Sequence, residues 1–138
     1  MNKARAILDT NIWVSFAIGK NLNQLENILL NPAIEIVTCT DSVKEFLNVV
    51  ERPKLQKYLK SERVEATKDL IFQFTTLYRH QTKISDARDP KDNYLLAASN
   101  ELKAEFLVTG DEDLLVLNPY HGTKILRFAD FVEAINGK

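Results

Sequence analysis

The fold of this chain is decided by residues 6–11, AILDTN, a short apolar run that ends directly in an aspartate. A second run of the same kind, EFLVTGDED at residues 105–113, puts two aspartates behind another apolar segment. Short apolar runs bounded by polar residues are typical of buried strands. In an open parallel sheet, ligands bind at the carboxyl ends of the strands. The sequence therefore predicts that Asp9 and Asp111, far apart along the chain, converge at one sheet edge.

Strand-like and helix-like segments alternate along the rest of the chain. We expect strands at residues 5–8, 34–37, 105–108 and 125–126. Apolar residues at helical spacing predict helices between them, with Thr40 and Asp89 as N-caps and a helical stretch in two pieces over residues 53–79. This alternation predicts an α/β fold with three layers, in which helices cover both faces of a central parallel sheet of about four to five strands.

The length of 138 residues fits one domain over residues 1–138. A formal net charge of −1 argues against binding of nucleic acid through bulk positive charge, but it allows contact with phosphate through metal ions and a local basic patch. Cys39 is the only cysteine, which excludes an internal disulfide and zinc sites built from several cysteines. No apolar run approaches the ~18–20 residues that span a bilayer, so we expect a soluble cytoplasmic protein.

Asp9 and Asp92 each have a structural and a functional interpretation. Asp9 either caps the helix that follows it or serves as a metal ligand or nucleophile at a strand end. Asp92 follows the predicted cap Asp89 by three positions, where a carboxylate favours the helix dipole. At ~100° per residue, Asp92 also falls on the buried side of its helix with Leu95 and Leu96, which would point it over the sheet edge.

Three further acids complete the candidate cluster. Asp111 and Asp113 flank Glu112, and one of them suffices to cap the short helix that follows. The apolar stripe of its helix puts Glu45 on the solvent face, unless that helix borders a cleft. Two carboxylates ~5 Å apart repel by ~3 kcal/mol at an effective dielectric of ~20, a large share of the ~5–15 kcal/mol that stabilises a domain. Either the acids are therefore spread apart or a divalent cation lies among them, and oxygen ligands favour Mg²⁺ or Mn²⁺ over zinc.

In four segments the sequence resembles the PIN domain, a family of metal-dependent ribonucleases. The segments are ILDTN at residues 7–11, Glu45 in the helix after the second strand, RDPKDN at residues 88–93 and LVTGDEDLL at residues 107–115. Their order and spacing match the family along nearly the whole chain. The sequence is most similar to PIN proteins of toxin–antitoxin systems, relatives of the VapC-type toxins.

The resemblance implies a PIN-like fold and a set of catalytic, metal-binding acids. The implied quartet is Asp9, Glu45, Asp92 and Asp111, with Asp113 as a supporting ligand. The implied cofactor is Mg²⁺ or Mn²⁺, which would polarise the scissile phosphate and activate a water for in-line attack. The implied reaction is endonucleolytic cleavage of RNA to a 5′-phosphate and a 3′-hydroxyl.

The resemblance also implies polar helpers and protein partners. Asn11 would orient Asp9, and Thr109 would lie near Asp111. A toxin of this kind implies a cognate antitoxin whose C-terminal segment covers the active site, and a homodimer. Both partner expectations are analogies to the family.

Basic residues near the predicted acids are weaker candidates for contact with RNA phosphates. They are Arg52, Lys54, Lys57, Lys60 and Arg63 after the Glu45 helix, and Arg88 and Lys91 beside Asp92. A solvated helix face is the simpler explanation for them. Trp13 and Phe16 are predicted to pack in the core or against a subunit in preference to stacking on bases. His80 and His121 are predicted surface residues with no partner.

Two other protein classes are rivals to this interpretation. A haloacid-dehalogenase-type phosphatase requires a second acid two residues on, where this chain has Asn11. A response-regulator receiver requires a phosphoacceptor at a later strand, and Cys39 and Thr40 fit that role poorly. The non-enzyme alternative is a catalytically idle PIN-like interaction module, whose carboxylates are structural or bind metal without turnover.

Overall fold

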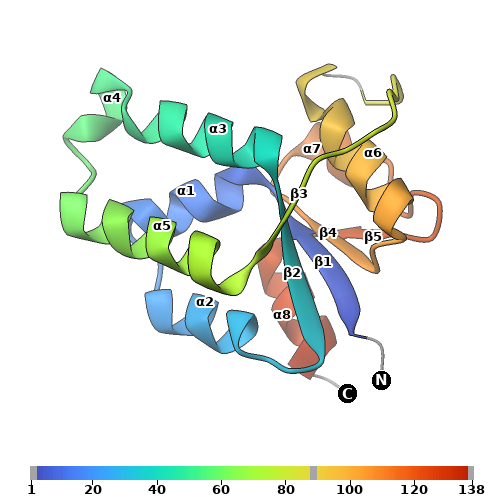
Figure 1. The fold of residues 1–138 in the computed structure, drawn as a ribbon, viewed down its shortest axis with the longest axis horizontal. Helices are drawn as coiled ribbons and strands as arrows, with labels where there is room; N and C mark the ends of the chain where they lie inside the picture. Colours follow the sequence, from blue (N-terminus) through green and yellow to red (C-terminus); the bar gives the residue numbers. More distant parts are fainter. Residues whose placement is uncertain (1–2, 88–89, 137–138) are drawn as a thin grey trace.

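The computed structural model describes residues 3–87 and 90–136 (Figure 1). The strands are β1 (Ala4–Leu8), β2 (Ile34–Cys39), β3 (Thr76–Tyr78), β4 (Phe106–Val108) and β5 (Lys124–Leu126). The helices are α1 (Thr10–Ile18), α2 (Leu22–Leu29), α3 (Thr40–Val50), α4 (Pro53–Gln56), α5 (Ser61–Phe74), the 3₁₀ turn η1 (Pro90–Asp92), α6 (Asn93–Leu102), α7 (Glu112–Leu115) and α8 (Phe128–Asn136). Within this described part, no helix is long and apolar enough to cross a membrane.

The strands form one sheet in the order β3-β2-β1-β4-β5, and every neighbouring pair is parallel. From β1 the chain builds outward through β2 and β3, and then returns to add β4 and β5 on the other side of β1. β1 and β4 are therefore neighbours at the point where the strand order reverses, with Leu8 level with Val108. In open α/β sheets, ligand sites lie at such a point, beyond the carboxyl ends of the strands.

Alternate residues of the strands face two separate hydrophobic clusters. Ala6, Leu8 and Phe106 pack with residues of α1, α2, α3, α5 and α8 on one face. Ile7 and Leu107 pack with residues of α6 and α7 on the other face. Side chains alternate across a strand, so apolar residues at successive positions bury both faces of the sheet. The predicted three-layer α/β/α fold with a central parallel sheet is confirmed.

Residues 76–78 form the edge strand β3, whereas the sequence predicted a helical stretch as far as residue 79. α5 ends at Phe74, and Thr75 turns to an extended conformation with φ −119° and ψ 156°. β3 then pairs with residues 37–39 of β2. The apolar residues of this segment fit a helical period as well as a strand, so the pairing with β2 decides its conformation.

One predicted helix cap is displaced by one position. Thr40 is the first residue of α3, and Cys39 occupies the N-cap position without a side-chain hydrogen bond to the helix. The reason is that β2 continues to Cys39 and passes directly into α3 without a loop. The other predicted cap, Asp89, lies outside the described residues.

Candidate functional site

Asp9 lies directly beyond the carboxyl end of β1, where the strand order reverses. It is 5% exposed and occupies the N-cap position of α1, but its side chain makes no hydrogen bond that caps the helix. Instead, Asp9 Oδ2 accepts a 2.8 Å hydrogen bond from the hydroxyl of Thr109, just beyond the end of β4. The buried carboxylate is therefore held between two strand ends and does not serve as a helix cap.

Further hydrogen bonds connect Thr109 to the acids that follow β4. The backbone N–H of Asp111 donates to Thr109 Oγ1 at 3.0 Å. The backbone N–H of Asp113 in turn donates to Asp111 Oδ1 at 2.9 Å, so Asp111 caps α7. Thr109 thus lies between Asp9 and Asp111 and fixes their relative positions.

Negative charge from two other elements acts on Asp9. Burial raises the pKa of Asp9 to about 6, although hydrogen bonds from the Thr109 side chain and the Thr10 backbone lower it. The charges of Glu45 and Asp111 raise this pKa further. Ionised Asp9 is therefore destabilised at neutral pH, and a bound cation would reverse that effect.

Glu45 is exposed on α3, while Phe46 and Val50 on the same helix are buried. α3 begins directly beyond the carboxyl end of β2, so its first turns border the same sheet edge as Asp9 (Figure 1). The charge of Glu45 reaches Asp9, since it contributes to the raised pKa there. A solvent-facing position and a place at the rim of the site are therefore compatible.

Tyr94 on α6 reaches this site, and the sequence analysis missed it. Its hydroxyl lies 2.9 Å from Ser42 Oγ on α3 and 3.4 Å from Thr10 Oγ1 on α1. Burial raises the pKa of Tyr94; hydrogen bonds to Ser42 and Thr10 oppose this rise, and the charges of Asp9 and Glu45 add to it. The protonated hydroxyl therefore bridges the starts of α1 and α3, the two helices that follow β1 and β2.

Asp92 is the last residue of η1 and occupies the N-cap position of α6 without a side-chain cap hydrogen bond. Its Oδ2 atom is buried. Tyr94 follows Asp92 by two positions, and its hydroxyl reaches Thr10 beside Asp9. That short separation is the sequence signal that points to Tyr94.

The predicted orienting residue Asn11 and the described candidates for RNA binding lie in different parts of the structure. Asn11 is exposed in the first turn of α1, and the hydrogen bond that orients Asp9 comes from Thr109. Arg52 and Lys54 are exposed beyond the far end of α3, ~15 Å along the helix from its start. Arg88 and the side chain of Lys91 lie outside the described residues.

Arg63, one of the candidate phosphate ligands, has a structural role instead. Its Nη2 atom donates to the backbone oxygens of Phe16, at 2.7 Å, and Lys20, at 2.5 Å. These oxygens lie in and just beyond the last turn of α1, where carbonyl groups lack partners within the helix. The guanidinium therefore closes the end of α1 and is not directed at a substrate.

The aromatic and histidine predictions have mixed outcomes. Trp13 and Phe16 are fully buried, which confirms packing in the core. His121 is exposed, as predicted. The prediction for His80 is wrong, because His80 Nε2 lies 3.8 Å from Asp41 Oδ2 and its ring faces that of Tyr94.

The acidic side chains do not form a ready metal chelate in the described part of the chain. Within residues 3–87 and 90–136, no three histidine, cysteine, aspartate or glutamate side chains are grouped closely enough to hold a metal ion. The donor chemistry nevertheless fits a hard divalent cation. Asp9 is a buried carboxylate whose ionisation is opposed by burial and by two further carboxylates, and oxygen donors are those that Mg²⁺ and Mn²⁺ prefer.

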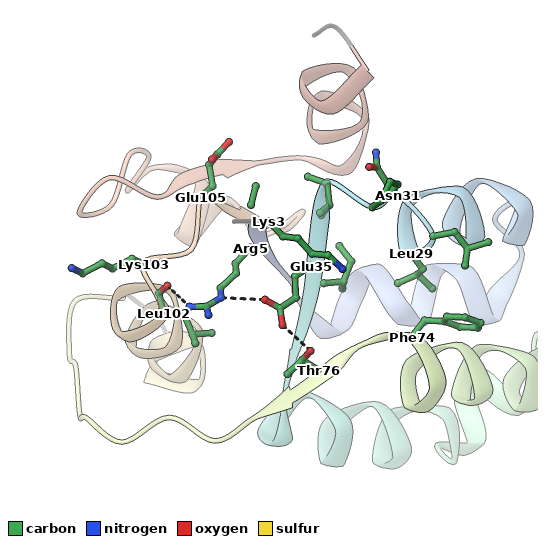
Figure 2. Close-up of a pocket in the computed structure, with 15 residues that line it drawn as sticks. Lys3, Arg5, Leu29, Asn31, Glu35, Phe74, Thr76, Leu102, Lys103 and Glu105 are labelled. Atoms are coloured by element: carbon green, nitrogen blue, oxygen red, sulfur yellow. Dashed lines mark hydrogen bonds and ion pairs between the residues drawn. The ribbon is translucent and has the colours of Figure 1, made fainter. Parts of the chain in front are cut away.

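A hollow of about 990 Å³ lies at the opposite edge of the sheet, where the strands begin (Figure 2). Two of its charged groups, Arg5 and Glu35, pair with protein atoms. Arg5 forms a 3.2 Å ion pair with Glu35 and donates to the backbone oxygen of Leu102 at 3.1 Å. Glu35 also accepts a 3.0 Å hydrogen bond from Thr76. At the carboxyl edge, by contrast, Asp9 is buried and lies within reach of the charges of Glu45 and Asp111. The carboxyl edge is therefore the candidate site, although the hollow at the opposite edge is large.

Residues 5–113 match the family model of the PIN domain. The chain belongs to the PIN-domain family. The match extends from β1 into α7 and covers Asp9, Glu45, Asp92 and Asp111. PIN domains are generally nucleases, so the family supports a hydrolase role for this chain.

Three solved structures share the PIN fold with this chain. PAE2754 from Pyrobaculum aerophilum has a TM-score of 0.65 at 10% identity, over 98% of this chain and 91% of that one. VapBC2 from Rickettsia felis, bound to a DNA fragment from its promoter, has a TM-score of 0.56 at 17% identity, and the match covers 88% of this chain and 96% of that one. The PilT N-terminus domain protein SSO1118 from Sulfolobus solfataricus P2 has a TM-score of 0.56 at 14% identity, over 94% and 92%. A comparison with curated proteins gave no match.

Proposed function

We propose that this PIN-domain protein is an endoribonuclease that hydrolyses RNA phosphodiester bonds with Mg²⁺ or Mn²⁺. One observation carries the proposal: a buried carboxylate, Asp9, lies at the strand reversal and feels the charges of Glu45 and Asp111. Strongly perturbed carboxylates in such a place are candidates for metal binding and acid–base chemistry.

Asp9, Glu45, Asp92 and Asp111 would hold the cation, with Asp113 in a supporting position. A bound divalent cation supplies Lewis-acid stabilisation of the phosphate and lowers the pKa of a water molecule.

The chain's own residues prepare this site in three ways. Thr109 holds Asp9 Oδ2 by a hydrogen bond and so fixes the orientation of the Asp9 carboxylate. Asp111 is fixed at the start of α7 through the N–H of Asp113. The start of α1 carries the partial positive charge of a helix N-terminus, which favours an anionic phosphate beside Asp9.

We further propose that the protein is the toxin of a toxin–antitoxin pair and acts as a homodimer. The fold shared with VapBC2 of Rickettsia felis supports partnering with an antitoxin. Expression of the wild-type chain alone is expected to arrest growth of a bacterial host, whereas Asp9→Asn is expected to permit growth at equal protein level. Growth arrest by both proteins would contradict the link between toxicity and cleavage.

The second candidate is the interaction module without turnover. The observation that favours it is the absence of a ready chelate among the described acids. The two candidates differ in turnover and not in metal affinity, since an idle module also binds cations.

The test of the nuclease is a cleavage time course on several single-stranded RNAs with Mg²⁺, with Mn²⁺ and with EDTA. We expect cleavage with either metal, none with EDTA and none by Asp9→Asn. Glu105→Gln is a matched acidic control from the opposite sheet edge and is expected to cleave normally. Absence of cleavage of every RNA by folded wild-type protein would favour the interaction module.

A further inference from the structure

A separate pocket of about 380 Å³ opens beside the carboxyl edge, between α6, the start of α3 and the segment that follows β3. We call it the His80 pocket. Its walls include Asp41, His80, Lys83, Ile84, Asn93 and Tyr94. Its size falls within the range of ~300–1,000 Å³ that is typical of small-ligand pockets.

The wall formed by residues 80–84 is held in place by Glu101 on α6. Glu101 accepts hydrogen bonds from the backbone N–H groups of Gln81, at 2.9 Å, and Thr82, at 2.6 Å. It also accepts from the hydroxyl groups of Thr82 and Tyr78. The other end of the segment is tied to α6, since the Ala87 N–H donates to Asn93 Oδ1 at 2.9 Å. Hydrogen bonds at both ends of this segment therefore fix the wall of the pocket against α6.

Two rings form the core of the pocket. The ring centroids of His80 and Tyr94 lie 6.3 Å apart, with their planes inclined by 33°. His80 Nε2 lies 3.8 Å from Asp41 Oδ2, and His80 Nδ1 lies 3.0 Å from the Thr82 carbonyl oxygen. Flat, oriented rings of this kind are the surfaces on which proteins stack unpaired bases of single-stranded RNA.

The polar groups of the pocket suit a nucleotide more than a purely apolar ligand. Asp41 offers carboxylate oxygens that accept hydrogen bonds from an exocyclic amine or imino group of a base. Lys83 is exposed at the rim, where its ammonium group is placed to approach a phosphate. Ile84 adds an apolar surface beside the rings.

Tyr94 connects this pocket with the candidate catalytic site. Its ring lines the pocket, while its hydroxyl lies 2.9 Å from Ser42 and 3.4 Å from Thr10, the residue after Asp9. Only the Tyr94 side chain therefore lies between a ligand stacked on its ring and Thr10, the residue next to Asp9. That separation suits a nucleotide adjacent to the phosphate that is cut.

We propose that the His80 pocket binds a base of single-stranded RNA beside the scissile phosphate, by stacking on the paired rings of His80 and Tyr94. The proposal rests on the nuclease function proposed above and adds the residues that select and position the substrate. A metal ion is a poorer occupant, because Asp41 and His80 alone do not make a chelate in the described part of the chain.

The experiment is an NMR titration of the metal-free protein in EDTA with each of the four nucleoside 5′-monophosphates and, separately, with ribose 5-phosphate. Amide signals of residues 80–84 and 93–94 are expected to shift with at least one nucleotide and not with ribose 5-phosphate. Titration to about 10 mM brings a site with a dissociation constant of about 1 mM close to saturation, and a site with a constant of about 10 mM to half-saturation.

Two variants of His80 separate stacking from a structural role. His80→Ala is expected to weaken nucleotide binding by about tenfold or more. His80→Phe keeps a ring but loses the contact with Asp41, and it is expected to retain binding. Tyr58→Ala removes an exposed ring outside the pocket and is the matched control; it is expected to bind as the wild type does.

Equal shifts with ribose 5-phosphate would overturn the proposal, because they would show an anion site without base recognition. The absence of shifts with all four nucleotides would also overturn it. If RNA is cleaved while no nucleotide shifts these signals, the proposal for the His80 pocket is wrong and the proposed nuclease function is supported. If nucleotides bind but no RNA is cleaved, nucleotide binding by the His80 pocket is supported and the proposed nuclease function is contradicted.

Discussion

The hydroxyl of Thr109 donates a 2.8 Å hydrogen bond to Asp9 Oδ2, across a separation of 100 positions in the sequence. The bond exists because β1 and β4 are parallel neighbours, with Leu8 level with Val108, so the next residue of each strand meets the other. It joins the first predicted acid to the segment that carries Asp111. The candidate site is therefore a direct product of strand order and register.

Replacement of Thr109 tests this bond. Thr109→Val keeps the side-chain shape but removes the donor, so we expect the pKa of Asp9 to rise above its value of about 6. The free energy of unfolding is expected to fall by ~1 kcal/mol, the usual net contribution of one such hydrogen bond. The measurement is a ¹³C NMR titration of the Asp9 carboxyl in EDTA. Thr109→Ser restores the hydroxyl and should return the pKa; an unchanged pKa in Thr109→Val would show that the bond does not act on Asp9.

The raised pKa of Asp9 predicts a pH dependence of stability in the metal-free protein. Folded Asp9 binds its proton up to a pH of about 6, whereas the unfolded chain releases it near 3.8. Stability is therefore lost as the pH rises through this window, by ~3 kcal/mol for a shift of this size. Asp9→Asn mimics the protonated form, so it should be more stable than the wild type at about pH 7.5 and equal to it below about pH 4. Urea unfolding of both proteins in EDTA measures the difference, and a constant difference across this range would contradict the assignment.

Arg63 is predicted to act on the fold and not on RNA. Arg63→Met removes the hydrogen bonds to the backbone oxygens of Phe16 and Lys20, so we expect a loss of ~1–3 kcal/mol in the free energy of unfolding. The Michaelis constant for RNA is expected to stay within twofold of wild type in the folded protein. Lys57→Met, which removes a positive charge at an exposed position, should leave stability unchanged. A weaker affinity for RNA with unchanged stability would reverse this interpretation.

Glu101 is predicted to order the segment that forms the wall of the His80 pocket. Burial opposes its ionisation, but hydrogen bonds from Thr82, Tyr78 and the Gln81 and Thr82 backbones lower its pKa to about 2. This stabilisation is present above the ordinary pKa of 4.5 and is lost as the pH falls towards about 2. Glu101→Gln is therefore expected to be less stable than the wild type at neutral pH, with a difference that vanishes near pH 2.

Amide hydrogen exchange gives the local readout for Glu101. The N–H groups of Gln81 and Thr82 donate to Glu101, so their exchange should accelerate in Glu101→Gln while core amides change little. Glu133→Gln on α8 is the control for loss of one exposed acid. Unchanged protection of Gln81 and Thr82 would show that other contacts hold the segment.

The features set by local sequence pattern were predictable. The apolar runs before Asp9 and Asp111, with helical patterns between them, were enough to predict the parallel sheet and the meeting of two strand ends. The apolar stripe of α3 correctly placed Glu45 on the solvent side. These predictions need only the periodicity of a chain and the general geometry of α/β sheets.

The features that depend on a distant partner were not predictable in this way. Residues 76–78 become a strand because β2 offers an edge. Tyr94 belongs to the site because its hydroxyl meets Ser42 and Thr10, which lie 52 and 84 positions away. Arg63 was a weak candidate for contact with RNA phosphates, since nothing local shows that the end of α1 lies within its reach. A pattern in one segment reports burial and conformation but not the identity of the group across the contact.

The most direct test of the central claim is paramagnetic broadening of amide NMR signals by Mn²⁺. The account predicts that substoichiometric Mn²⁺ first broadens signals of residues 9–11 and 109–113, that Glu45 lies within the affected region, and that Asp9→Asn abolishes the effect. Broadening centred on Glu35 and Glu105, at the opposite edge of the sheet, would place the metal elsewhere and contradict the account.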